Sequence, residues 1–282
     1  MTKKKVCAKK QKQQTTKFIG DDDLKLSYEL LHHLPFSVRK QRTLEPTKFT
    51  KKFGNITMTI DCSGGLITVF DIKVLFAIFK FFQDNSEKIK ENVISGSGGK
   101  DKIINTIANI NFSKFIKNYT TTTIEHKDNI IASIERLYKY TVIIKLEKEL
   151  TVVPIRYLYD FEIKDGITSF SIIKKVYENL LKGLTCKYDT LLKIKGNIAS
   201  ALYLFLIGQN KTSFSETSLL NILNLENNRK SKFELKAAFT ELKKIGFLFF
   251  NDDELIRIDK DDNYYCFSYP PVKINNPKNA TY

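Results

Sequence analysis

Cysteine and histidine are scarce in this chain of 282 residues, and their scarcity argues against the commonest metal sites. The sequence has four cysteines, Cys7, Cys62, Cys186 and Cys266, and three histidines. No two cysteines form the C-x-x-C spacing typical of structural zinc sites, so we expect neither a metal nor a cofactor. Cysteines scattered without a disulfide framework also favour a reducing compartment, which predicts a cytoplasmic protein.

Long hydrophobic runs are absent as well. Apolar runs such as Val74–Phe79, which has six residues, fall far short of the about 18 to 20 residues needed to cross a bilayer. The lysine-rich leader has no apolar stretch behind it, so we do not expect it to be a secretory signal. The sequence therefore predicts no membrane-embedded segment and no membrane partner.

Motifs of common enzymes are also missing. The loop from Gly96 to Lys100 superficially resembles a phosphate-binding loop, but that motif needs Gly where Ile94 stands and Ser or Thr where Asp101 stands. His32 and His33 are adjacent, so on a helix or a strand their side chains point in different directions. No Ser/His/Asp or Cys/His arrangement is evident. We therefore expect that the chain is not an enzyme.

Positive charge, in contrast, is abundant. The 46 lysines and arginines exceed the 31 aspartates and glutamates, which gives a net charge of +15 at pH 7. Seven of these charges belong to lysines among the first 17 residues, so the remaining 265 residues still carry about +8. Because Lys and Arg neutralise phosphates and release condensed counterions, this excess favours a polyanionic partner. Nucleic acid is the first candidate and an anionic membrane surface is the second.

The predicted elements divide the chain into three parts. Residues 1–23 form a flexible basic arm. Residues 24–181 form a first module, in which a helix starting at the capping residues Thr68 and Asp71 precedes two further helices and a long β-rich region. That region contains a turn at Asp165-Gly166, and a helix over 172–181 connects it to the rest of the chain. Residues 182–282 form a second module that repeats the order of elements.

The second module gives the clearer pattern. A first helix is predicted over Ile198–Leu206, followed by a short extended piece over Thr212–Ser215 and a second helix capped by Ser213 or Ser215. Three helices followed by a β-hairpin form the winged-helix plan. We therefore predict an α+β fold with two tandem winged-helix domains, of which the first fits the plan less closely.

The third helix of the second module is predicted to begin with a capping box, Ser231–Glu234, and to end at Gly246. The strands Phe247–Phe250 and Leu255–Ile258 are then expected to form the hairpin, with an acidic tip at Asn251–Glu254.

This third helix carries the candidate DNA-binding face. At about 100° per residue, an apolar stripe that includes Leu235 and Leu242 occupies one side, which we expect to be buried. The opposite side has cations and small residues but no carboxylate, so it would let Lys or Arg reach phosphates or guanine edges and an apolar group meet a thymine methyl. A solvated helix face is the alternative interpretation. The candidate residues are Arg229, Lys230, Lys232, Phe233, Lys236, Ala237, Thr240 and Lys244.

The corresponding helix of the first module is less basic. Its predicted outward residues are Asp128, Asn129, Ala132, Arg136 and Lys139, so its charge is nearly balanced. Two interpretations stay open: Asn129, Arg136 and Lys139 contact DNA, or the helix serves packing or self-association. Alternating residues in the β-rich sequence beside it would supply a sheet edge for such pairing. They are Val153, Ile155, Tyr157 and Tyr159.

Three stretches of sequence resemble a known family. They are Leu66–Val74, Ile198–Leu206 and Lys236–Phe247, and the last contains A-x-x-E-L-K-K-I-G-F. Over about residues 25 to 270, the chain resembles the plasmid replication initiator (Rep) proteins built from two winged helices, especially the TrfA-like branch.

That resemblance implies a function. Rep proteins of this kind bind direct repeats, or iterons, in double-stranded DNA at an origin, assist its opening, and recruit the host initiator and the replicative helicase. They also exchange between homodimers and origin-binding monomers, with the first module making the dimer contacts. We expect the same activities here, in the bacterial cytoplasm. The alternatives are a winged-helix transcriptional regulator that binds operator DNA and a scaffold that binds an anionic membrane surface or other proteins.

Overall fold

A computed structural model of the chain describes most residues between Asp23 and Cys266. The described ranges are 23–27, 36–38, 46–53, 56–95, 102–146, 151–209, 213–247, 255–259 and 262–266. The predicted arm of residues 1–23 lies outside these ranges except for Asp23, as do His32, His33 and the loop from Gly96 to Lys100.

The second module has the complete order of winged-helix elements. They are α7 (Asn197–Ile207), β11 (Ser213–Ser215), α8 (Glu216–Ile222), α9 (Arg229–Lys244), β12 (Leu255–Asp259) and β13 (Asp262–Cys266). The three strands form an antiparallel sheet in the order β11-β13-β12. The predicted cap of α8 is confirmed, because the Ser215 side chain accepts a hydrogen bond from the Ser218 N–H.

A hairpin of β12 and β13 lies at the end of the described part of this module. Leu255 lies opposite Tyr265, so β12 pairs with β13, and the predicted strand Leu255–Ile258 is confirmed as β12. At its other edge β13 pairs with β11, where Phe214 also lies opposite Tyr265. Residues 248–250 and the predicted acidic tip at 251–254 lie outside the described residues.

Helix α9 begins earlier than its predicted capping box. Asn228 is the N-cap, and its side chain accepts a hydrogen bond of 2.9 Å from the Ser231 N–H. The predicted cap at Ser231 is therefore wrong, because Ser231 is the donor and lies within the first turn. The C-terminus is as predicted: Gly246 has a φ of 74°, and the Phe247 N–H donates to the Leu242 carbonyl at 3.0 Å.

The first module repeats this plan. Its elements are α2 (Val69–Asp84), the short 3-10 helix η1 (Ser86–Lys88), β4 (Lys90–Ile94), β5 (Lys102–Asn111), α3 (Phe112–Tyr119), η2 (Ile124–His126), α4 (Lys127–Tyr138), β8 (Asp160–Lys164) and β9 (Ile167–Ile173). The sheet order is β4-β5-β9-β8, so β5-β9-β8 repeats the arrangement β11-β13-β12 with β4 added at the edge. The predicted α+β fold with two tandem winged helices is therefore confirmed.

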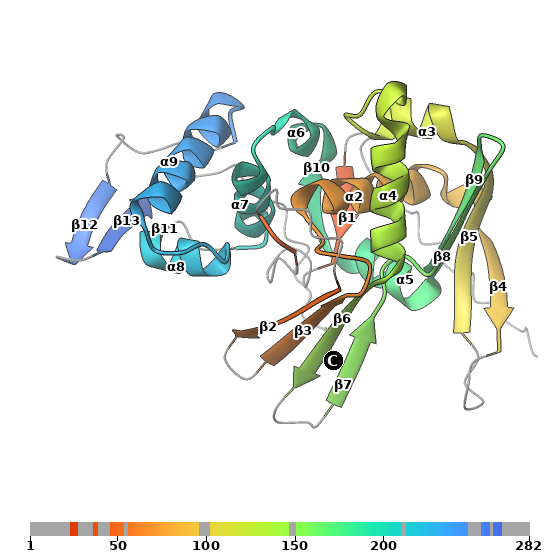
Figure 1. Ribbon diagram of the computed structural model, residues 1–282, viewed down its shortest axis with the longest axis horizontal. Coiled ribbons are helices and arrows are strands. Elements are labelled where there is room, and N and C mark those ends of the chain that lie inside the picture. Colours follow the sequence, from red (N-terminus) through yellow and green to blue (C-terminus); the bar gives the residue numbers. More distant parts are fainter. Residues whose placement is uncertain are drawn as a thin grey trace, which may run out of the picture.

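Residues inserted into the first module explain its longer β-region. β6 (Tyr140–Leu146) and β7 (Thr151–Ile155) follow α4 and form a second antiparallel sheet with β2 (Thr47–Phe53) and β3 (Ile56–Cys62), in the order β2-β3-β6-β7. Figure 1 shows this sheet projecting below the helices. The chain then returns to the winged-helix plan through β8 and β9, joined at Asp165-Gly166, where both residues have positive φ as the predicted turn requires.

The connecting segment consists of α5 (Lys174–Lys182), β10 (Leu184–Lys187) and α6 (Tyr188–Lys193). The predicted connecting helix is confirmed as α5. β10 pairs antiparallel with β1 (Asp23–Leu26), with Leu24 opposite Cys186. A Cβ at Gly183 would collide with the Leu26 carbonyl, so only glycine permits this close approach.

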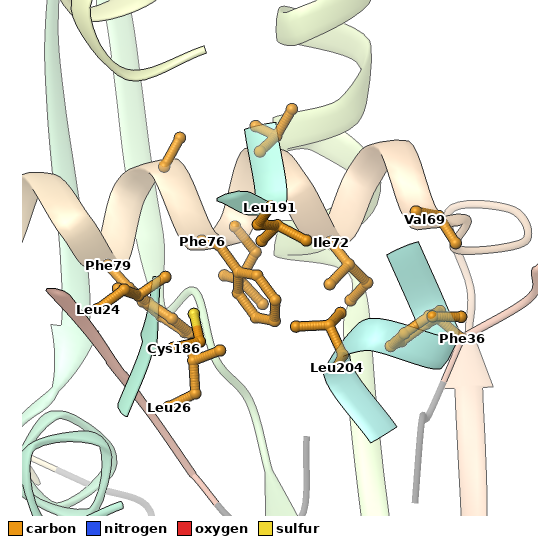
Figure 2. Close-up of a cluster of buried hydrophobic side chains, with 14 of the residues drawn as sticks. Leu24, Leu26, Phe36, Val69, Ile72, Phe76, Phe79, Cys186, Leu191 and Leu204 are labelled. Carbon is orange, nitrogen blue, oxygen red and sulfur yellow. The ribbon is translucent and has the colours of Figure 1, made fainter. Parts of the chain in front are cut away.

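One hydrophobic core runs through both modules, and α2 lies at its centre. Ile72, Phe76 and Phe79 of α2 are fully buried. In Figure 2, Leu191 of α6 and Leu204 of α7 point toward this helix, as do residues of β1 and β10. The core therefore continues across the predicted module boundary between residues 181 and 182, and packing of α2 against α7 holds the two modules together.

Candidate DNA-binding surface

The two faces of α9 divide as the helical spacing predicts. The buried stripe consists of Leu235, Ala238, Phe239 and Leu242. The exposed residues on the other side are Arg229, Lys230, Phe233, Lys236, Ala237, Thr240 and Lys244. Both carboxylates of α9, Glu234 and Glu241, are only partly exposed and lie on the flanks of the helix. The outward face of α9 is therefore cationic and free of acidic residues.

This face is accessible at one end of the molecule. In Figure 1, α9 lies far from the β4–β5 hairpin of the first module, with α8 beneath it and the β12–β13 hairpin beside it. In winged-helix and helix-turn-helix proteins this third helix enters the major groove, and its N-terminal residues contact the bases. The first two turns of α9 form one wall of an open hollow. Its lining residues are Asn227, Asn228, Arg229, Lys232, Phe233 and Lys236.

Among the candidate residues of α9, Lys232 forms an ion pair with a residue of another helix. Its Nζ lies 3.0 Å from Oε1 of Glu216, whose side chain is only 1% exposed. Glu216 is the first residue of α8, so this ion pair joins the second helix of the module to the third. Lys232 therefore holds the helix-turn-helix together, and sequence periodicity, which treats α9 as an isolated helix, does not reveal that role.

The flank of α9 that faces the first module is also anchored. Oε1 of Glu241 accepts hydrogen bonds from the backbone N–H groups of Lys195, at 2.6 Å, and Gly196, at 3.2 Å, just before α7. The adjoining Ile194 carbonyl accepts a hydrogen bond of 2.6 Å from Nζ of Lys73 on α2. Burial lowers the pKa of Lys73 to about 8, although the nearby charge of Glu241 opposes the shift. Segment 194–196 thus links α9 to α2.

In the first module, Arg136 is buried instead of facing outward. Its guanidinium Nη2 lies 2.6 Å from Oδ1 of Asp71, and the Arg136 and Asp71 side chains are 7% and 0% exposed. Ser133 donates to the same oxygen at 2.7 Å, while Oδ2 accepts the Thr68 N–H at 2.8 Å. The predicted capping pair Thr68 and Asp71 is confirmed. The prediction of an outward Arg136 is wrong, because the buried carboxylate of that cap needs a cationic partner.

The other predicted residues of α4 do not form a continuous basic surface. Asn129 and Lys139 are exposed but lie at opposite ends of the helix, and Arg136 does not join them. Asp128 and Glu135 are exposed on the same helix. The cationic face is therefore a property of α9, and the structure does not repeat it on α4.

The predicted sheet edge divides into separate parts. Val153 and Ile155 belong to β7, which is an edge strand of its sheet. Tyr157, however, is buried and stacks on Tyr140 with ring centroids 6.2 Å apart. The Tyr159 N–H donates to the Ser171 carbonyl at 2.8 Å. The predicted strand with alternating side chains over 153–159 thus ends at Ile155. After Ile155 the chain leaves the sheet that contains β7 and enters the sheet that contains β8 and β9.

Neither metal ligands nor a membrane span is found in the described part of the chain. No group of three or more His, Cys, Asp or Glu side chains among these residues is arranged to hold a metal ion. The helices described above are all too short or too polar to traverse a bilayer.

Comparison with solved structures identifies proteins of similar fold. Two crystal structures of domains 2 and 3 of RctB each superpose on 86% of this chain. One has a TM-score of 0.53, 12% sequence identity and 98% of its own chain covered. The other has a TM-score of 0.50, 13% identity and 96% coverage. No protein-family model and no curated protein matches the chain. At these identities the likeness concerns the fold, so the chain shares the architecture of RctB domains 2 and 3.

Proposed function

We propose that this chain is a replication initiator that binds double-stranded DNA at an origin. The observation that carries the proposal is the outward face of α9, which presents cations without carboxylates from the recognition position of a winged helix. RctB, whose domains 2 and 3 share the fold, is a replication initiator of Vibrio chromosome II. The net charge of +15 favours the same polyanionic partner.

The dimensions of α9 suit this role. Arg229 and Lys236 are seven residues apart, which corresponds to about 10 Å along a helix at 1.5 Å per residue. A major groove about 12 Å wide admits such a helix, with phosphates along both of its edges. The small side chains of Ala237 and Thr240 allow the backbone of α9 to approach the bases closely. Because Lys232 is paired with Glu216, we assign DNA contacts first to Arg229 and Lys236.

The finer parts of the proposal follow from the resemblance to Rep proteins. They are binding to iterons of a plasmid origin, assistance in duplex opening, recruitment of the host initiator and the replicative helicase, and exchange between homodimer and monomer. The first module then makes the dimer contacts and the second binds DNA. This division is supported by the balanced charge of α4 and the cationic face of α9.

A binding experiment tests the DNA contacts. Duplex fragments that tile the DNA flanking the gene would be titrated with the wild-type protein and with Arg229→Ala, Lys236→Ala and Lys90→Ala at several salt concentrations. Lys90 is an exposed lysine of β4, at the opposite end of the molecule, so its variant has the same charge change as Lys236→Ala. We expect the α9 variants to lose about 1 to 3 kcal/mol if the side chain contacts a base, or to lower the salt slope by about one if it contacts a phosphate.

The Lys90 variant should bind like the wild type. Equal binding by all four proteins would contradict the assignment of the interface to α9, and the absence of any bound fragment would contradict DNA binding altogether.

Footprinting with permanganate on the bound fragment separates initiation from transcriptional regulation. An initiator should protect several head-to-tail repeats and make thymines in a neighbouring A/T-rich segment reactive. A transcriptional regulator should protect an inverted repeat and leave the duplex closed. The second result would replace the proposed function with the regulatory one.

A further inference from the structure

The most exposed large hydrophobic side chain in the described part of the molecule lies on the candidate DNA-binding face. Phe233 is 73% exposed, compared with 66% for Val93 of β4. Water contact with an aromatic ring of this size is unfavourable, and covering the ring is correspondingly favourable. The fold places this ring among cations, on the helix that is expected to enter the groove.

The neighbours of Phe233 define the kind of surface that it forms. Arg229 and Ala237 lie one helical turn before and after it, so the three share one stripe of α9. The amide of Asn228 caps α9 and the ammonium of Lys232 is paired with Glu216, so these two polar groups on the rim of the hollow are already engaged. The ring thus provides an apolar spot that Ala237 extends, bordered by Arg229 on one side.

We propose that Phe233 recognises the 5-methyl group of thymine in the major groove. Each base pair presents polar atoms there, and the thymine methyl is the apolar group on these edges. Phe233 lies in the second turn of α9, beside cations that can reach phosphates or guanine. Its ring would therefore contact the methyl group of a thymine next to those phosphates or guanines. The inference rests on the proposed function. It predicts that the DNA sites bound by the protein carry a thymine at the position that Phe233 contacts.

Replacement of thymine by deoxyuridine tests this contact, because the exchange removes the methyl group and keeps the base-pairing pattern. Each thymine of the bound fragment would be replaced in turn, and the dissociation constants of the wild type, Phe233→Ala and Lys236→Ala would be measured by fluorescence anisotropy. For the wild type we expect a weakening of about fourfold at one or two adjacent positions, which is the equivalent of the ~0.8 kcal/mol gained by burying one methyl-sized group. Lys236→Ala should keep this discrimination, while Phe233→Ala should bind thymine and uracil equally well at those positions.

Two results would overturn the inference while leaving the proposed function intact. One is specific binding by the wild type with no loss at any deoxyuridine. The other is discrimination that persists in Phe233→Ala, since another group would then contact the methyl. Failure of the wild type to bind any flanking duplex would instead contradict the proposed function itself. Because Phe233 is exposed, we expect its variant to fold normally, and a thermal melt would verify this.

Discussion

Replacing Arg136 by methionine should destabilise the protein strongly, although a helix-face analysis places this residue on the surface. The guanidinium is buried beside Asp71, with a separation of 2.6 Å, and Asp71 is completely inaccessible to solvent. Removal of one partner of a buried ion pair typically costs about 3 to 5 kcal/mol, because the remaining charge stays desolvated. Ser133 and Thr68 still donate to the carboxylate, so we expect a loss near 3 kcal/mol, at the lower end of this range.

The free energy of unfolding would be obtained from urea titrations followed by circular dichroism. Lys139→Met provides the control, because Lys139 is exposed at the end of the same helix and its replacement should change stability by no more than about 0.5 kcal/mol. The double variant Arg136→Met with Asp71→Asn should recover part of the loss, since no unpaired charge is then buried. DNA affinity, measured at a temperature where each variant is folded, should match that of the wild type.

An Arg136→Met variant as stable as Lys139→Met would refute the reasoning, since the ion pair would then contribute nothing. A variant with normal stability and reduced DNA affinity would restore Arg136 to the DNA-binding surface.

Two further predictions concern the packing of the fold. Burial lowers the pKa of Lys73 from its ordinary 10.5 to about 8, so the unfolded chain binds more protons than the folded one between these values. The free energy of unfolding of the wild type, relative to that of Lys73→Met, should therefore rise by about 2 to 3 kcal/mol from pH 7 to pH 10. If urea titrations give a difference between the two proteins that does not change with pH, the burial of the Lys73 charge is contradicted. Leu242 is fully buried on α9, so Leu242→Ala should cost about 2 to 5 kcal/mol in the same assay. The exposed Lys230→Ala should stay within about 0.5 kcal/mol of the wild type, and similar values for both would show that the two faces of α9 are assigned wrongly.

The sequence alone determined the features that depend on neighbours along the chain. The buried stripe of α9 follows from helical spacing, the start of α2 from the pair Thr68 and Asp71, and the end of α9 from the conformational freedom of Gly246. These signals involve residues within a few positions of one another, so local propensity suffices to read them. The winged-helix order of elements was therefore predictable from the sequence, as was the outward cationic face that carries the proposed function.

Only the tertiary structure showed which of the cations predicted to face outward are paired with a buried carboxylate. Arg136 pairs with Asp71, 65 positions earlier in the sequence, and Lys232 pairs with Glu216 of the preceding helix. β11 likewise pairs with β13, although α8 and α9 separate the two strands in the sequence. Helical periodicity identifies the polar side of a helix. It does not predict where a buried carboxylate on another helix or strand lies. Burial of such a carboxylate without a partner is unfavourable, so a cation within reach forms an ion pair with it. The charge of that cation is then paired within the fold.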